Sequence, residues 1–163
     1  MIIVKNNLLT YNDTSYKCAI GKNGIVKKKI EGDKCTPAGT YTLEKIYYRS
    51  DRLTLPNLNF QTIPILKNYG WCDDIKSEKY NKLIKLPFEY RHEQLFRNDN
   101  IYDIICTINY NNNPVKKNLG SAIFLHIANY NYSGTAGCIA IKKSDLINLL
   151  QKINSHTTIK IFA

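Results

Sequence analysis

Residues 121–141 read SAIFLHIANYNYSGTAGCIAI and contain the two runs that decide the fold. Ser121–Ala128 and Cys138–Ile141 are short, mostly apolar and separated by a polar loop, which predicts two buried strands. If these strands are neighbours in one sheet, the imidazole of His126 and the thiol of Cys138 emerge side by side.

A histidine beside a cysteine is a candidate base and nucleophile. A thiol with a pKa near ~8.5 is a weak nucleophile at neutral pH, but an imidazole can take its proton, and the resulting thiolate–imidazolium pair lowers that pKa. Gly137 has no Cβ and would let the backbone N–H groups of Gly137 and Cys138 point at a developing oxyanion. The structural alternative stays open, because a lone cysteine is often a small buried hydrophobe and a strand-end histidine is often hydrogen-bonded in a core.

The remaining sequence is typical of a mainly β protein. Runs rich in Ile, Val, Thr and Tyr predict further strands at Ile2–Lys5, Tyr16–Gly21, Ile25–Ile30, Thr40–Arg49, Tyr102–Tyr110 and Thr157–Phe162. Asn23-Gly24 lies between two of these runs and predicts a two-residue hairpin, because both turn positions need a positive φ. The amino-terminal region should therefore form a meander.

One segment has helical periodicity instead. Between Ser144 and Ile153, apolar residues recur at 146, 149, 150 and 153, which predicts a short amphipathic helix near the C-terminus with Ser144 as its N-cap. The middle region, residues 50–97, has no clean periodicity, so long ordered loops or a lid are expected there. A chain of 163 residues, 44% of them hydrophobic, is expected to form a single domain over 1–163.

Charge and cysteine content narrow the class of protein. The net charge is +10, but Lys and Arg are scattered through the chain, so nucleic-acid binding is not expected. Five widely spaced cysteines without a C-x-x-C pair argue against a disulfide framework and a zinc site, and no metal or cofactor is expected. No apolar run is long enough to span a membrane and the start lacks a secretory pattern, so a cytoplasmic location is expected, or a periplasmic one if export uses an unrecognised route.

Two separate blocks carry a resemblance to a known family. The first is His126, a loop and then Thr135-Ala136-Gly137-Cys138; the second is Gly32–Tyr41, which follows the pattern G-x-x-x-T-P-x-G-x-[FY]. Both resemble the YkuD-type L,D-transpeptidase family. The middle region adds stretches that look like the islands of a signal-less bacterial branch of it: Gly70-Trp71-Cys72-Asp73-Asp74, Tyr80-Asn81, Leu86-Pro87, His92-Glu93, Tyr102-Asp103 and Tyr110-Asn111. The resemblance implies a β-sandwich of mixed sheets with a short helix near the active-site strand.

The resemblance also assigns roles to residues. Cys138 matches the nucleophile and His126 the base, and Ile127 occupies the position whose backbone carbonyl orients the imidazole. Thr135 and Gly137 match the small residues of the motif. Two positions depart from the family pattern and bear on substrate recognition: Ala136 stands where a His is common, and Ala140 where an Arg or Asn is common.

Residues of the middle region are candidates for the substrate pocket. An anionic stem peptide needs a cationic or donor-rich cradle, which His92 or Arg97 could supply in place of the wall that Ala136 lacks. Trp71 could line the same cleft. The alternatives are a solvated histidine and arginine and a buried tryptophan anchor. The four other cysteines are expected to be structural thiols: Cys18, Cys35, Cys72 and Cys106.

The implied activity is attack on the carbonyl of an L-centre residue in a peptidoglycan tetrapeptide stem, with an acyl-enzyme on Cys138 and loss of D-alanine. Water as acceptor makes an L,D-carboxypeptidase, whereas an amine acceptor makes an L,D-transpeptidase that forms 3–3 cross-links. A cytoplasmic protein would meet soluble muropeptides, so the expectation leans to carboxypeptidase action in peptidoglycan recycling. A non-catalytic wall-binding or nucleic-acid-binding module is the remaining alternative. The expected partner is a stem peptide or muropeptide, without nucleic acid or membrane, and a monomer is expected.

Overall fold

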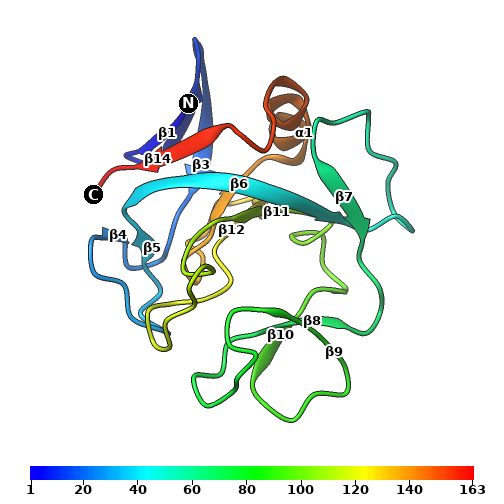
Figure 1. Ribbon diagram of the computed structural model, residues 1–163. Coiled ribbons are helices and arrows are strands. Elements are labelled where there is room, and N and C mark those ends of the chain that lie inside the picture. The colour runs from blue at the N-terminus through cyan, green and yellow to red at the C-terminus, as the bar shows by residue number, and fades with distance from the viewer.

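The computed structural model describes residues 1–163 and is built mainly of strands (Figure 1). One mixed sheet has the order β11-β12-β13-β3-β2-β1-β14-β6-β7. Its strands are β1 (Ile2–Lys5), β2 (Leu8–Tyr11), β3 (Thr14–Ala19), β6 (Gly39–Tyr48), β7 (Gln61–Pro64), β11 (Ile104–Ile108), β12 (Phe124–Ile127), β13 (Ile139–Ile141) and β14 (Thr158–Ile161). The predicted fold class, mainly β with mixed sheets and one short helix near the C-terminus, is confirmed.

Strand β6 closes this sheet on itself. Its first half pairs antiparallel with β14, where Thr42 lies opposite Thr158, and its second half pairs with β11, where Tyr48 lies opposite Ile104. Figure 1 shows β6 as a long arc that passes over β11 and β12. The two halves of the sheet therefore enclose a common core, because alternate residues of each strand point inward.

Helix α1 (Lys143–Lys152) covers part of that core. Leu146, Leu149 and Leu150 are fully buried, which agrees with the helical spacing of apolar residues in the sequence. The predicted N-cap at Ser144 is wrong: Lys142 is the N-cap, and its carbonyl accepts the first helical hydrogen bond from Leu146 N–H at 2.9 Å. The one helix falls short of the length and apolarity that crossing a membrane requires.

The amino-terminal meander is confirmed, but its turns are not the predicted one. β1, β2 and β3 pair antiparallel in sequence order, with left-handed residues at Asn6, Asn7 and Asn12 between them. Asn23-Gly24 forms a turn without a hairpin, because β3 pairs with β2 and β13 while β4 (Ile25–Val26) pairs parallel with β5 (Thr36–Pro37). The hairpin prediction is therefore wrong, because β4, the strand after the turn, pairs with the Thr-Pro strand β5 and not with β3.

The middle region contains more regular structure than ordered loops alone. Strands β8 (Tyr69–Cys72), β9 (Leu83–Lys85) and β10 (His92–Gln94) form a small antiparallel sheet in the order β10-β8-β9. We call residues 65–97 the small lobe; Figure 1 shows its sheet below the main sheet. Trp71 of β8 packs edge-on against Phe124 of β12, with ring centroids 5.1 Å apart, and so joins the lobe to the main sheet.

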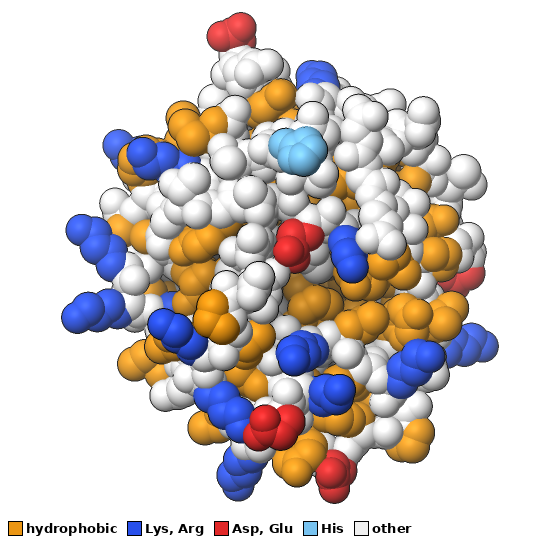
Figure 2. Space-filling model, viewed as in Figure 1, with side chains coloured by type: hydrophobic (Ala, Val, Ile, Leu, Met, Phe, Trp, Pro, Cys, Tyr) orange, Lys and Arg blue, Asp and Glu red, His pale blue; other side chains and the backbone are white.

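Positive charge is spread over the face of the molecule seen in Figure 2. On the face shown in Figure 2, Lys and Arg side chains are separated by hydrophobic, neutral and acidic ones and form no continuous stripe. Some are paired with acids, for example Lys117 with Glu78 at 2.9 Å. The expectation that the chain does not bind nucleic acid stays a prediction.

Candidate active site

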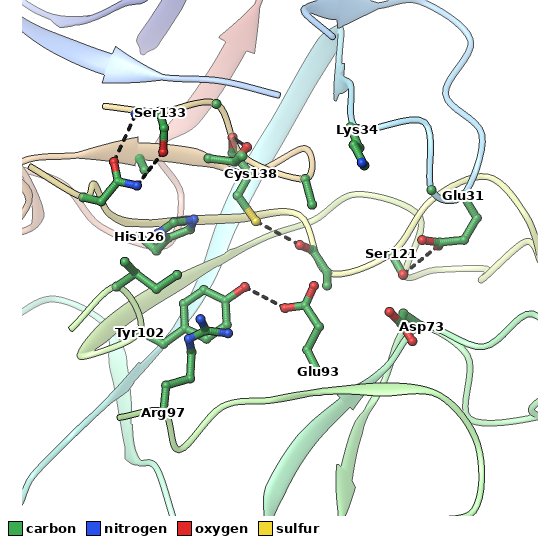
Figure 3. Close-up of a pocket in the computed structure, with 18 of the residues that line it drawn as sticks. Glu31, Lys34, Asp73, Glu93, Arg97, Tyr102, Ser121, His126, Ser133 and Cys138 are labelled. Carbon is green, nitrogen blue, oxygen red and sulfur yellow. Dashed lines mark hydrogen bonds between the residues drawn. The ribbon is translucent and has the colours of Figure 1, made fainter. Parts of the chain in front are cut away.

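The two residues singled out by sequence lie on one face of the main sheet. β12 and β13 pair parallel, with His126 opposite Ala140. Cys138 lies two residues before Ala140, so the alternation of strand side chains points its thiol to the same face as the imidazole. Both side chains line a cleft of about 460 Å³, and Figure 3 shows them at its edge. The prediction that these two strands are neighbours in one sheet is therefore confirmed.

The Cys138 thiol is protonated in the free protein. Its side chain is buried, and Sγ donates to the carbonyl oxygen of Ala122 at 3.1 Å (Figure 3). Burial raises the pKa of Cys138 to about 12, an effect that the backbone N–H of Phe124 only partly offsets. At neutral pH the sulfur therefore carries its proton and points it away from the imidazole.

The His126 imidazole is neutral and held in one orientation. Nδ1 lies 2.9 Å from the carbonyl oxygen of Ile127, and Tyr102 packs edge-on against the ring. Burial lowers the pKa of His126 to about 4. Because a carbonyl oxygen only accepts, the proton of the neutral ring sits on Nδ1 and leaves Nε2 with a free lone pair. Burial thus favours the neutral form of both groups in the free protein, and the thiolate–imidazolium pair stays a prediction.

The turn before Cys138 is tied to the other sequence block. Thr135 Oγ1 accepts from the Gly137 N–H at 3.1 Å and donates to the Cys138 carbonyl at 2.6 Å. Thr36 Oγ1 donates to the Gly137 carbonyl at 2.9 Å, so the Thr-Pro block holds the Gly-Cys block directly. The Gly137 N–H is engaged by Thr135 in the free protein, and the oxyanion role of the Gly137 and Cys138 N–H groups stays a prediction. Glycine is needed here for another reason: φ is +140° and a Cβ would lie 2.7 Å from the Cys35 carbonyl oxygen.

The buried side-chain amide of Asn81 holds Ala122, the residue whose carbonyl accepts the hydrogen bond from the Cys138 thiol. Ala122 has a positive φ of 52°, an unfavourable conformation for a residue with a Cβ. Asn81 Oδ1 accepts from the Ala122 N–H and from Trp71 Nε1, both at 3.0 Å, while Asn81 Nδ2 donates to the carbonyls of Tyr110 and Asn111. Asn81 therefore positions the backbone under Cys138, a role that sequence reasoning missed although it noted the Tyr80-Asn81 and Tyr110-Asn111 islands.

The opposite side of the cleft is charged. We call Asp73, Arg91, Glu93 and Arg97 the charged wall; all four come from the small lobe and line the cleft. Glu93 accepts from Tyr102 OH at 2.6 Å, and burial raises the pKa of the Glu93 carboxyl (Figure 3). Arg91 pairs with Asp73 at 3.0 Å, and Arg97 pairs with Asp99 at 2.6 Å. The cleft thus offers both signs of charge to a ligand.

The structure separates the predicted substrate residues into two groups. Arg97, Thr135 and Ala136 line the cleft, as does Ala140 beneath the imidazole. His92 and Trp71 do not, and these two predictions are wrong. The alternation of side chains along β10 points Glu93 into the cleft and leaves His92 bonded to the Tyr90 carbonyl at 2.7 Å.

Four other cysteines are free and buried, and none of them lines the cleft: Cys18, Cys35, Cys72 and Cys106. Burial raises the pKa of Cys18 to about 12 and also raises that of Cys106. No group of three or more His, Cys, Asp or Glu side chains is arranged to hold a metal ion. Cys138 is therefore the one cysteine whose side chain lines the cleft.

Comparison with known proteins identifies the family of this chain. The family model described as YkuD, L,D-transpeptidase catalytic domain, matches residues 1–161. No curated protein sequence matches the chain. Among solved structures, the chain is similar to Bdellovibrio bacteriovorus Bd1075, with 20% identity and a TM-score of 0.47, and to Mycobacterium tuberculosis L,D-transpeptidase 1, with 9% identity and a TM-score of 0.40. Both comparisons cover 99% of this chain, which spans 47% of the first structure and 60% of the second.

Proposed function

The chain belongs to the YkuD family of L,D-transpeptidase catalytic domains, and on that premise we propose that it is a cysteine enzyme acting on the L,D peptide bond of peptidoglycan tetrapeptide stems. One observation carries the proposal: the parallel pairing of β12 with β13 sets Cys138 and His126 on one face of the sheet within one cleft. Cys138 is the nucleophile, His126 is the base, and the Ile127 carbonyl fixes the tautomer of that base.

The reaction starts from a neutral pair. The Cys138 thiol leaves the Ala122 carbonyl and turns toward the carbonyl carbon of the substrate. His126 Nε2 takes the thiol proton as the S–C bond forms, because burial disfavours a separate thiolate or imidazolium. The carbonyl electron pair moves onto oxygen. When it returns, the C–N bond breaks, the imidazolium gives its proton to the leaving amine, and a thioester on Cys138 and a free D-amino acid remain.

The first acceptor that we propose is water. The cleft is lined by charged side chains of both signs, which hold water near the thioester. His126 then takes a proton from the attacking water, and collapse of the second intermediate releases a tripeptide stem and restores the thiol. This reaction makes the enzyme an L,D-carboxypeptidase, and it fits a place in peptidoglycan recycling.

Transpeptidation is the second candidate, and one observation favours it. A hollow of about 590 Å³ adjoins the cleft and shares Ile101 and Asn129 with it. Tyr130, which is 96% exposed, stands at this hollow. An amine of a second stem peptide bound there would reach the thioester from the side of His126 and form a 3–3 cross-link.

The test is mass spectrometry of the protein after incubation with a disaccharide tetrapeptide. We expect tripeptide, free D-alanine and an acyl adduct on Cys138, all absent from Cys138→Ala. Cys72→Ala is the matched control, because Cys72 is equally buried but lies outside the cleft. Cross-linked dimers at high stem concentration would move the assignment to transpeptidase. No product and no adduct with the intact cysteine would overturn the catalytic proposal.

A further inference from the structure

Lys29 is the buried cation of the cleft. Its side chain is 3% exposed, and Nζ makes an ion pair with Asp33 Oδ1 at 2.6 Å. Asp33 is itself held by the backbone N–H groups of Ile30 and Cys35, both at 2.8 Å. Asp33 is the one protein hydrogen-bond partner of the ammonium, which has three donors. A buried ammonium with donors to spare has a strong demand for a second acceptor.

Two glycines bring this ammonium to the catalytic cysteine. A Cβ at Gly120 would lie 2.5 Å from Lys29 Cε, and a Cβ at Gly137 would lie 3.4 Å from Lys29 Nζ. Both glycines have positive φ values, +97° and +140°. The lysine stem therefore fills the space that a side chain at residue 120 would take, and its charge ends beside the residue that precedes Cys138.

The other cations at the cleft are less suited to bind an anion there. Arg91 and Arg97 are 61% and 37% exposed and already bonded to Asp73 and Asp99. Lys34 is exposed to solvent. Glu31, Glu93 and Asp73 face the same space and repel a carboxylate. Lys29 is thus the one cleft cation that is both desolvated and next to the nucleophile.

We propose that Lys29 binds the terminal carboxylate of the D-residue that leaves when Cys138 attacks, an inference that rests on the proposed function and names its specificity-determining residue. Consecutive residues are 3.8 Å apart along a peptide, so a carboxylate one residue beyond the attacked carbonyl falls close to a cation beside Gly137. Lys29 then requires a free carboxylate directly after the scissile bond. Asp33 keeps the ammonium in place until the carboxylate arrives.

The experiment measures binding in a Cys138→Ala background, where no turnover occurs. Two stem tetrapeptides are compared by calorimetry: one ends in a free carboxylate, the other in the isosteric carboxamide. We expect the carboxylate form to bind about 10- to 150-fold more tightly, the range of a hydrogen bond to a charged group. Lys29→Met should abolish that preference and leave affinity for the carboxamide within about twofold. Lys28→Met, an exposed neighbour outside the cleft, is the matched control.

Each result of the binding experiment either supports or overturns the role of Lys29. Loss of the preference in Lys29→Met with carboxamide binding retained supports the proposal, and it does so even if the intact enzyme proves inactive in the product assay. An equal loss of affinity for both peptides in a folded Lys29→Met protein would make Lys29 a structural residue and overturn the proposal. A Cys138→Ala protein that binds both peptides equally, or neither, would also overturn it. The Lys29→Met/Asp33→Asn double variant removes both charges and guards against misfolding from an unpaired Asp33.

Discussion

The two sides of the cleft differ in burial and in the kind of interaction that holds their side chains. The side that carries Cys138 and His126 belongs to the closed main sheet, where burial keeps both groups neutral and hydrogen bonds to backbone carbonyls fix them. The charged wall comes from the small lobe, and its two arginines form partly exposed ion pairs with Asp73 and Asp99. Chemistry needs groups held in place, whereas recognition of a polar ligand needs groups that can exchange partners. The two sides should therefore respond differently to substitution and to pH.

The largest effect is expected on the main-sheet side. His126→Gln keeps the polar shape of the side chain but cannot take a proton, so we expect kcat for stem cleavage to fall about 10²- to 10⁴-fold. Product formation measured by mass spectrometry checks this, with circular dichroism to show that the fold is kept. Retention of more than a tenth of the activity would mean that another group accepts the thiol proton.

A pH titration of stability is expected to show the next largest effect. The folded pKa of His126, about 4, lies below the unfolded value near 6.5. The neutral imidazole thus contributes stability that is complete above about pH 6.5 and lost as the pH falls through 4, about 3 kcal/mol in all. Urea unfolding at pH 7.5 and 4.5 measures it. His126→Gln should lose correspondingly less free energy of unfolding between pH 7.5 and 4.5. An identical pH profile for both proteins would contradict a buried neutral imidazole.

The charged wall should act on the thiol only modestly. Glu93 raises the pKa of Cys138, after the larger effect of burial, so Glu93→Gln should lower that pKa. The lower pKa gives more thiolate and should speed alkylation of Cys138 by iodoacetamide at pH 8 about 3- to 10-fold. Glu78→Gln is the control, because Glu78 lies on the surface outside the cleft. An unchanged rate would mean that Glu93 carries no charge toward the sulfur.

The smallest effect is expected at the rim of the wall. Arg91 pairs with Asp73 but is 61% exposed, so Arg91→Gln should cost less than about 1 kcal/mol of stability. If this arginine meets the ligand, KM for the stem peptide should rise a few-fold while kcat holds. Lys117→Gln breaks an exposed ion pair away from the cleft and should change neither. A large loss of stability in Arg91→Gln would make the wall structural, like the opposite side.

The same contrast explains what could be predicted from sequence. The pairing of Cys138 with His126 follows from two apolar runs and the loop between them, because strand alternation is a local rule. Glu93 was missed in favour of its neighbour His92, since the face of a three-residue strand depends on a register that only the folded small lobe fixes. Lys29 and Asn81 were missed because their roles arise from close approach to Gly137 and from the bent backbone at Ala122. Their physical signals are a buried charge and a buried amide, and sequence periodicity reports neither.

Closure of the main sheet has a consequence for folding. β14 lies between β1 and β6 and pairs with both, and its pairing with β1 joins Ile2 to Ile159. Contacts between residues so far apart in sequence carry a large loop-closure entropy and form slowly. Until β14 is in place, β1 and β6 each keep an edge that can pair with another chain. Partly folded molecules are therefore expected to be the aggregation-prone species of this protein.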